Sequence, residues 1–354
     1  MSQQFEITTF RPATVEELAK FLGSEYPSGE ISNEKYLSWE YLDNPYGKAI
    51  VTTARNSEKE IVAQYALLAE QINFEGKVIP ATLSMNTLTS KAYRGKGLFT
   101  STAIETFNYC RDNSVAFTFG VPNKNSFPVF VNKLEFKHAG DFVFMAKPLR
   151  PLKVLNAMIN RSEEKRGIAI PIAFDKNKLA EKSISDLIFP EDEKVYQKFL
   201  ELWQEQGNIS IHRSPVYMQW RYMQNPSKNY ELLKLVTEGE IKSVIVIRAM
   251  HLYGMKVCLV MDIMSLKEKY SNTLLKVISA EAKSNLLDLM IAIAAHKKSS
   301  QHFQFVHSAF WNIPRFLLPQ RLPFIIRVHN DYKNLSRVND LKNWHFSFGD
   351  YDVF

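Results

Sequence analysis

The spacing of apolar residues along the first part of the chain predicts alternating strands and helices. Residues 78–85 are apolar and rich in β-branched side chains, as strands are. Over residues 99–111 the apolar side chains recur every three or four positions, which predicts a helix with one buried face. A strand-like run over 114–121 and a helix-like run over 127–133 follow. The pattern therefore predicts an α/β fold.

A ten-residue segment occurs twice in the chain. Residues 36–45 read YLSWEYLDNP and residues 217–226 read YMQWRYMQNP, so five positions are identical and two exchange Leu for Met. Strand-like runs follow each copy, over 50–54 and 61–68 in one half and over 231–236 and 243–248 in the other. Two copies of one domain are the simplest source of such order. The recurring Trp39 and Trp220 are interpreted as packing residues.

A basic loop with two glycines joins the predicted strand 78–85 to the predicted helix 99–111. A helix N-terminus presents unpaired N–H groups and the positive end of its dipole, and both favour phosphate. Gly95 and Gly97 allow a ligand to approach the backbone closely, while Arg94 adds positive charge. Neither nucleotide pattern, G-x-x-x-x-G-K-[ST] or G-x-G-x-x-G, is present. The loop therefore predicts a phosphate site of another kind.

This loop resembles the acyl-CoA loop of the GNAT N-acetyltransferase superfamily, whose pattern is [QR]-x-x-G-x-[GA]. Here the six positions read RGKGLF over residues 94–99, and Phe99 stands where Gly or Ala is usual. The surroundings also resemble the family, because 10–18 looks like a first strand passing into a helix and Asn123 follows the strand 114–121. The resemblance covers roughly residues 5–147. It implies a mixed α/β sheet and acetyl-CoA as the co-substrate.

The resemblance also implies which residues contact the cofactor. Backbone amides near the end of the first central strand would meet the acyl group, the loop would hold the pyrophosphate, and Asn123 and Ser126 would reach the pantetheine arm or the thiol. The implied cofactor-binding residues are Leu88, Thr89, Arg94, Gly95, Lys96, Gly97, Leu98, Phe99, Thr100, Asn123 and Ser126.

In this family the amine attacks the thioester directly, so catalysis consists of positioning two substrates and moving protons. The family often places a Tyr as general acid where this chain has Val131, which leaves water or a hydroxyl such as Ser126 to protonate the thiolate. Asn86 stands where relatives often carry an Asp that acts as the general base, and an amide cannot accept a proton. In Eis-type enzymes the C-terminal carboxylate is the base, which would be that of Phe354. Other candidate bases are Glu40, Asp43, Glu70 and His138.

The second half of the chain lacks the phosphate loop. The segment 266–272 reads LKEKYSN, without a glycine that would let the backbone meet a pyrophosphate. The sequence therefore predicts two tandem GNAT-like domains, of which the second is degenerate. The expected boundaries are 1–147 for the acyl-CoA-binding domain, 148–185 for a helical linker and 186–354 for the degenerate domain. The aromatic stretch 343–354 is expected to form a final strand and an ordered tail.

Composition narrows the function further. The 354 residues carry a formal net charge of +7, without an Arg-rich arm or stacking platform for nucleic acid. No apolar run is long enough to span a membrane, and no signal peptide is recognisable. Cys110 and Cys258 lie on apolar runs and are expected to be buried free thiols, which suits a cytoplasmic protein. The histidines show no metal-ligand spacing, so no metal is expected.

The sequence thus predicts an acetyl-CoA-dependent N-acetyltransferase for a small amine, such as an amino sugar or an aminoglycoside-like molecule. Tandem relatives include Eis-type enzymes and acetyltransferases of surface polysaccharides, and the motifs do not choose between them. Two alternatives stay open at this point. One is a non-catalytic CoA-binding or regulatory protein, because the usual Tyr and Asp are missing. The other is a Fem-type aminoacyl transferase, against which the largely intact loop counts.

Overall fold

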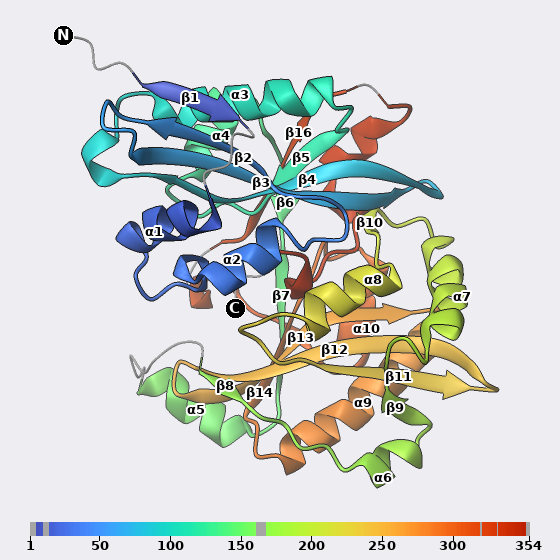
Figure 1. The fold of residues 1–354 in the computed structure, drawn as a ribbon. Helices are drawn as coiled ribbons and strands as arrows, with labels where there is room; N and C mark the ends of the chain where they lie inside the picture. Colours follow the sequence, from blue (N-terminus) through green and yellow to red (C-terminus); the bar gives the residue numbers. More distant parts are fainter. Residues whose placement is uncertain (1–4, 10–13, 161–167, 319–320, 331, 352–354) are drawn as a thin grey trace. The chain divides into compact units, whose positions relative to one another are not determined.

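The computed structural model describes residues 5–9, 14–160, 168–318, 321–330 and 332–351. The chain forms two compact units, each built around its own sheet (Figure 1). Unit 1 consists of Met1–Gly140, Asn225–Ser227 and Leu322–Asp340. Unit 2 consists of Asp141–Gln224, Lys228–Arg321 and Leu341–Phe354. Each unit therefore combines segments that are far apart in the sequence.

Unit 1 is organised around a mixed sheet with the strand order β1-β2-β3-β4-β5-β16-β6. The first four strands pair antiparallel, β4 and β5 pair parallel, and β16 is antiparallel to β5. The strands are β1 (Glu6–Thr9), β2 (Ile50–Arg55), β3 (Ile61–Phe74), β4 (Lys77–Thr89), β5 (Phe117–Gly120), β6 (Lys137–Asp141) and β16 (Pro323–Val328).

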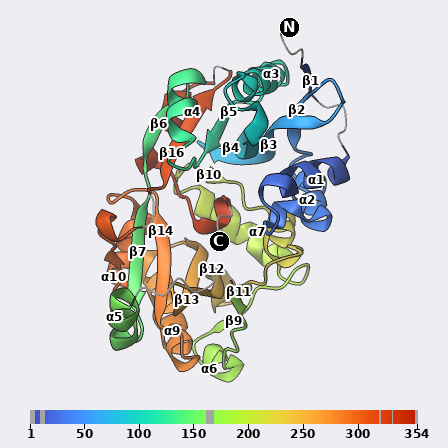
Figure 2. The same cartoon turned by 90° about the vertical axis from the view of Figure 1, so that its left-hand side faces the viewer.

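Helices cover both faces of the unit 1 sheet (Figures 1 and 2). On one face lie α3 and α4, and on the other lie α1 and α2. Their bounds are Val15–Glu25 for α1, Glu34–Tyr41 for α2, Leu98–Asp112 for α3 and Phe127–Lys133 for α4. Helix α1 begins where Thr14 and Glu17 form a capping box, which satisfies two backbone N–H groups. Helix α3 buries Ala103, Phe107 and Cys110, the helical stripe that the sequence predicts.

Unit 2 has a mixed sheet with the order β15-β7-β14-β13-β12-β11-β9, and β8 pairs with β12. The parallel pair is β13 with β14, and β7 is antiparallel to β14. The strands of this sheet are β7 (Val143–Pro148), β8 (Ala169–Ile170), β9 (Ile184–Asp186), β11 (Glu231–Thr237), β12 (Glu240–Leu252), β13 (Met255–Ser265), β14 (Leu289–Ala294) and β15 (Trp311–Asn312). The two-residue strand β10 (Ser210–Ile211) is not part of this sheet.

The helices of unit 2 also lie on both faces of their sheet, with α9 on one face and α7 and α8 on the other (Figure 1). The helices are α5 (Pro151–Ile159), α6 (Lys176–Ala180), α7 (Glu193–Gln204), α8 (Pro215–Met218), α9 (Glu268–Ser284) and α10 (Ser300–His307). A turn of π-helix over Gln219–Met223 extends α8. Among the described residues, no helix is both long and apolar enough to cross a membrane.

Both units follow one plan. Three antiparallel strands, β2-β3-β4 in unit 1 and β11-β12-β13 in unit 2, lead to a helix, α3 or α9, and then to a parallel strand, β5 or β14. The next strand in each sheet is antiparallel and comes from a distant part of the chain: β16 for unit 1 and β7 for unit 2. The predicted mixed α/β architecture with two sheets is confirmed. The domain boundaries predicted from the sequence repeat, 1–147, 148–185 and 186–354, stay a prediction.

Several local expectations can be compared with the structure. Cys110 and Cys258 are buried free thiols, as predicted. Trp39 and Trp220 are buried, as packing residues should be. The expected final strand is wrong within the described part of 343–354: the segment forms 3₁₀ turns at Leu341–Asn343 and Phe348–Asp350. Its aromatic side chains pack on their own unit, as Phe346 does against Phe142, and such packing does not require a strand.

The partly buried His329 makes the stability of unit 1 depend on pH. Its Nε2 lies 2.7 Å from Oγ1 of Thr118 on β5. Burial, and then the charges of Arg327 and Arg111, lower the pKa of His329 from 6.5 to about 3. Between these pH values the unfolded chain binds a proton that the folded chain does not, so stability falls as the pH falls.

We predict that His329→Gln reduces this loss, because Gln can keep a hydrogen bond to Thr118 but does not titrate. Urea unfolding of the full chain at pH 7 and pH 5 measures the effect. The free energy of unfolding lost by the wild type should exceed the loss in the variant by about 1–2 kcal/mol. Equal losses in both proteins would contradict the prediction.

Candidate functional site

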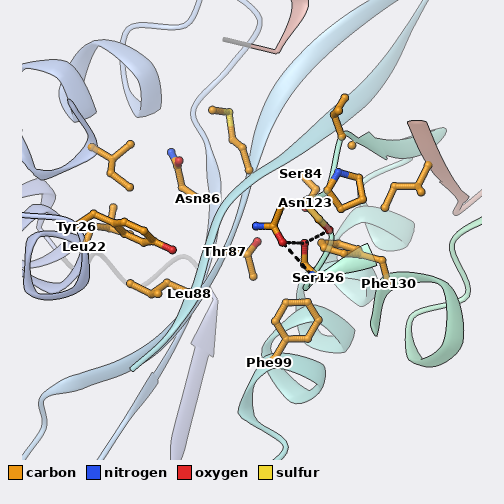
Figure 3. Close-up of a pocket in the computed structure, with 16 residues that line it drawn as sticks. Leu22, Tyr26, Ser84, Asn86, Thr87, Leu88, Phe99, Asn123, Ser126 and Phe130 are labelled. Atoms are coloured by element: carbon orange, nitrogen blue, oxygen red, sulfur yellow. Dashed lines mark hydrogen bonds between the residues drawn. The ribbon is translucent and has the colours of Figure 1, made fainter. Parts of the chain in front are cut away.

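The end of β4 is distorted by a β-bulge. In the pairing of β3 with β4, the register shifts between Gln64 and Ala66, so that Asn86 and Thr87 together face the single residue Tyr65. Asn86 adopts a left-handed backbone conformation with φ of 51°, which Asn tolerates better than most residues. The bulge places Asn86 and Thr87 on opposite sides of β4 (Figure 3).

Strands β4 and β5 separate at the same place. They pair from Thr82–Ser84 with Thr118–Gly120, and β4 then continues to Thr89 paired with β3 only. A pocket of about 260 Å³ lies at this separation. It is lined by Leu22, Tyr26, Ile31, Ser84, Met85, Asn86, Thr87, Leu88, Phe99, Gly120, Val121, Pro122, Asn123, Ser126, Phe130 and Ile325 (Figure 3).

The basic loop forms the N-terminus of α3 beside this pocket. Gly95 and Gly97 have φ of 81° and 79°, and Gly97 is the N-cap of α3. A Cβ at either glycine would meet no atom within 4 Å, so open space faces the backbone here. The amide of Ser101 bonds to the carbonyl of Gly97, whereas the amides of residues 98–100 have no partner within the helix. With no acidic residue in its first turn, α3 has the features of an anion site.

Cationic side chains surround the loop. Arg94 is exposed, and its Nε donates to the carbonyl of Thr89, which ties the loop to the end of β4. The Lys96 ammonium lies over the Tyr93 ring, 4.9 Å from its centre. Glu25 at the end of α1 accepts from the Lys91 amide, and this bond, with the nearby cations, lowers the pKa of its carboxyl. The loop is thus anchored in place while it keeps a positive potential.

Asn123 and Ser126 form the wall of the pocket that faces β4. The Oδ1 atom of Asn123 accepts from the amides of Asn125 and Ser126, at 2.9 and 3.0 Å. The Ser126 hydroxyl lies 3.3 Å from the same atom. Asn123 therefore shapes the turn that opens α4 and fixes Ser126 at its N-cap, facing Thr87 across the pocket (Figure 3).

The Phe99 that departs from the GNAT pattern belongs to an aromatic wall. Its ring makes edge-to-face contacts with Phe130, at 5.5 Å between centres, and with Tyr65, at 5.9 Å. The Ser84 hydroxyl lies 3.1 Å from that of Tyr65. Burial is the main reason why the pKa of Tyr65 is raised, so this phenol stays neutral. Phe99 thus fills space that a small residue would leave open.

The other side of the pocket belongs to α1 and the bulge. Leu22 and Tyr26 line it there, on the same side of β4 as Asn86 (Figure 3). The Asn86 amide donates to Oε2 of the buried Glu40 on α2, at 2.6 Å. The Gln64 amide donates to the main-chain oxygen of Asn86, at 2.9 Å, and so supports the bulge.

The residues predicted from the sequence fall into two groups. Leu88, Phe99, Asn123 and Ser126 line the pocket. The remaining predicted residues lie at the end of β4 and in the loop and first turn of α3, outside the pocket lining: Thr89, Arg94, Gly95, Lys96, Gly97, Leu98 and Thr100. Phe354, whose carboxylate was a candidate base, lies outside the described residues.

The candidate bases Glu40, Asp43, Glu70 and His138 do not line the pocket. Glu40 contacts the pocket-lining Asn86. Glu70 faces Ala81 within the β3–β4 pair, and His138 packs edge-to-face on Phe127. Neither of these lines the pocket, and nor does Asp43. In the described part of the chain, no cluster of His, Cys, Asp and Glu could hold a metal ion.

Sequence reasoning missed three polar groups of the pocket. Ser84, Thr87 and Tyr26 line it, and the buried Thr87 hydroxyl has no hydrogen-bond partner within the described residues. Thr87 and Asn86 follow an apolar strand, and two polar residues at a strand end are a weak signal. The bulge that points them to opposite sides depends on pairing with β3, which the sequence does not reveal.

The corresponding place in unit 2 is filled by protein. In β13 the register with β12 shifts so that Met261 is an extra residue next to Asp262, as at the bulge of β4. Ser347, in the C-terminal segment, donates to Asp262 at 3.1 Å. The buried Arg213 joins Asp262 at 2.5 Å and Asp350 at 2.9 Å. Burial opposes ionisation of Asp262, but the charge of Arg213 holds the pKa of this carboxyl below its usual value.

Residues 9–138 match the family model of the acetyltransferase (GNAT) domain. The match contains the bulge of β4, the loop before α3 and the turn at Asn123, which are the parts of the site described above. This segment, which is less than half of the chain, is therefore similar to a GNAT acetyltransferase domain. No curated protein sequence matches the chain.

Solved structures of N-acyltransferases share the fold over most of the chain. A probable N-acyltransferase from Enterococcus faecalis, a conserved protein of unknown function, aligns with a TM-score of 0.65 and 11% identity, over 92% of this chain and 72% of that one. A GCN5-related N-acetyltransferase from Anabaena variabilis aligns with a TM-score of 0.61 and 12% identity, over 92% of this chain and 73% of that one. N-myristoyltransferase of Saccharomyces cerevisiae with bound myristoyl-CoA aligns with a TM-score of 0.60 and 13% identity, over 98% of this chain and 88% of that one. Together with the GNAT domain, this fold supports a GNAT-type N-acyltransferase.

The C-terminal segment of unit 2 suggests a stability test at Gly349. The carbonyl of Gly349 accepts from Nε of Arg221, at 2.7 Å. A Cβ at this position would lie 2.0 Å from the Tyr222 hydroxyl and 3.0 Å from the carbonyl of Met261. We predict that Gly349→Ala lowers the free energy of unfolding by about 1–3 kcal/mol, because the segment must move off the bulge.

Urea unfolding of wild type and variant measures the loss. Adding Tyr222→Phe to Gly349→Ala removes the nearest clashing atom and should recover part of it. If Gly349→Ala is as stable as the wild type, the segment does not pack against Tyr222 in the way described.

Proposed function

We propose that the protein is an acetyl-CoA-dependent N-acetyltransferase of the tandem-GNAT subgroup, with a small primary amine as the acceptor. This proposal depends on two features of unit 1 that lie next to each other. The anion-binding start of α3 lies beside the separation of β4 and β5, and Phe99 in the first turn of α3 also lines the pocket at that separation. A ligand with a diphosphate at one end and a thioester at the other suits this arrangement.

The proposed positions of the co-substrate follow from the chemistry of each wall. The pyrophosphate would accept from the unpaired amides of residues 98–100, with Arg94 and Lys96 nearby. The pantetheine arm would pass between β4 and the turn at Asn123. Myristoyl-CoA bound to the yeast N-myristoyltransferase shows that a protein of this fold binds an acyl-CoA. Acetyl is proposed as the acyl group because the pocket, at about 260 Å³, is small.

The reaction would be a direct transfer. The amine nitrogen attacks the thioester carbon, the new C–N bond forms, and the C–S bond breaks after the tetrahedral intermediate. The nitrogen loses one proton and the thiolate gains one, so that an amide and free CoA leave. On the thiolate side the candidate donors are the hydroxyls of Ser126 and Thr87, since Val131 stands where relatives carry a Tyr.

Calorimetry with acetyl-CoA tests the loop. We expect micromolar binding by the wild type and a loss of about 100-fold or more in Gly97→Glu, because a carboxylate there would take the place of the phosphate. Gly76→Glu is a matched control: Gly76 also has a positive φ, 74°, and open space, but it lies in the β3–β4 turn. It should bind as the wild type does. Absence of wild-type binding would overturn the acetyl-CoA site.

Acyl transfer is tested with glucosamine and kanamycin as acceptors. We expect release of CoA thiol, and a mass increase of the amine by one acetyl group, that depend on both substrates and are absent in Gly97→Glu. Acetyl-CoA binding without transfer to any amine would instead identify a non-catalytic CoA-binding protein. Transfer that requires aminoacyl-tRNA would identify a Fem-type enzyme.

A further inference from the structure

Helix α5 of unit 2 exposes apolar side chains along one face. None of the nine residues of Pro151–Ile159 is buried. Leu152, Leu155 and Ile159 follow each other at intervals of three and four positions and so share a face, which Met158 borders. Their exposed fractions are 84%, 55%, 72% and 46%. A surface helix normally directs such side chains into the protein, so this arrangement is unusual.

The opposite side of α5 rests on the unit 2 sheet. Val154 and Ala157 lie on that side and are half-buried, and α5 packs against β13. In both views α5 lies at the edge of unit 2, and no described helix or strand of that unit covers its outer side (Figures 1 and 2). The larger apolar side chains of the helix are therefore the ones that point away from the unit.

Basic residues border this apolar face at the start of α5. Arg150 directly precedes the helix, and the exposed Lys153 lies in its first turn. The Arg150 guanidinium donates to the carbonyl of Leu286 at 3.2 Å, and the Leu286 amide donates to the carbonyl of Lys283 at 3.0 Å. Leu286 and Lys283 are both exposed, so the turn before β14 adds one apolar and one basic side chain beside α5.

The acidic residue nearest to this face does not cancel its charge. Asp288 is buried, and its Oδ1 lies 3.4 Å from the Arg150 guanidinium. Lys153 and Lys283 form no ion pair with any described residue, and residues 147–159 contain three basic residues and no acidic one. The apolar face of α5 is thus bordered by exposed positive charge.

We propose that α5 binds the surface of an anionic lipid bilayer. Leu152, Leu155 and Ile159 would enter the boundary between headgroups and acyl chains, while Lys153 and Lys283 would meet lipid phosphates. A helix of nine residues is only about 13 Å long, so it lies in the plane of the surface and does not span the bilayer.

The charge of the face is the reason for choosing a bilayer over a second copy of the chain. A symmetric contact between two copies would bring each α5 face against itself. The Lys153 and Lys283 side chains of both copies would then come together, and like charges oppose such contacts. An anionic surface instead complements them. The proposal does not depend on acyl transfer, because α5 belongs to unit 2 and contributes nothing to the pocket of unit 1.

Co-sedimentation of the full chain with vesicles tests the proposal. The vesicles consist of phosphatidylcholine alone or of phosphatidylcholine with about 30% phosphatidylglycerol. We expect half-saturation at about 0.1–1 mM of the anionic lipid, and binding at least about tenfold weaker to phosphatidylcholine alone. Raising the salt concentration to about 0.5 M should weaken the binding to anionic vesicles, because salt screens the exposed lysines.

Leu152→Gln combined with Ile159→Gln removes the two most exposed apolar side chains of α5 and should weaken binding about tenfold or more. Val195→Gln combined with Leu202→Gln is the matched control. These two residues are also seven positions apart on one helix of unit 2, α7, and are 40% and 41% exposed. The control should bind as the wild type does. Both variants should keep the urea midpoint of the wild type, since the changes are on the surface.

Lys153→Gln combined with Lys283→Gln tests the charges separately. The affinity for anionic vesicles should fall about fivefold for each lysine removed. Binding to phosphatidylcholine alone should stay the same, because that lipid carries no net charge.

Three results would overturn the proposal. One is the absence of vesicle binding by the wild type, or equal binding to both kinds of vesicle. Another is unchanged binding by the α5 double variant. The third is a wild-type dimer in analytical ultracentrifugation that the α5 substitutions dissociate, without vesicle binding, since a second copy would then cover this face. None of these results bears on acetyl-CoA binding, which calorimetry measures separately and which each variant should retain.

Discussion

The arrangement of unit 1 depends on the way β4 leaves its neighbour β5. After Ser84 and Gly120 the two strands stop pairing, and the bulge at Asn86 and Thr87 turns the remaining part of β4. Separating two central strands exposes backbone groups that a regular sheet would bond, so a ligand or buried side chains must compensate them. The pocket lies at this place, with polar side chains from β4 and from the turn that follows β5 around it.

Several interactions maintain that separation. Gln64 and Glu40 hold Asn86 from β3 and α2, while the edge-to-face contacts of Phe99 with Tyr65 and Phe130 fill the space towards α3 and α4. The helix α3 begins immediately after the loop that follows β4, so its amide-rich end is carried next to the pocket. The distortion of one strand thus positions both an anion site and a polar cleft.

Unit 2 shows what the same plan becomes when the cleft is filled. Its bulge at Met261 is retained, but Arg213, Asp262 and Asp350 form a buried ionic network over it with the C-terminal segment. Its helix α9 begins with the acidic Glu268, whereas the first turn of α3 has no acidic residue. A carboxylate at a helix N-terminus satisfies the dipole and repels phosphate. Unit 2 therefore keeps the fold without the anion site.

The pairing of β5 with β16 and of β14 with β7 explains why the domain boundaries were harder to predict from the sequence than the repeat. The repeated segments follow local patterns, such as the apolar spacing of α3 and the recurring Trp39 and Trp220, and sequence reasoning found them. The partners of β5 and β14 are instead β16 and β7, which are far away in the chain. Pairing between distant strands leaves no local periodicity from which it could be predicted.

The sequence by itself determined the fold class, the two sheets, the helix α3 and the loop with Gly95 and Gly97, because each rests on spacing or on a backbone conformation that few residues adopt. The tertiary structure alone decided which polar groups meet at the pocket. Glu40 and Asn86 are 46 positions apart and show no pattern in the chain, yet the bulge brings them to 2.6 Å. Contacts of this kind depend on the register between strands and on the packing of α2, which only the folded chain establishes.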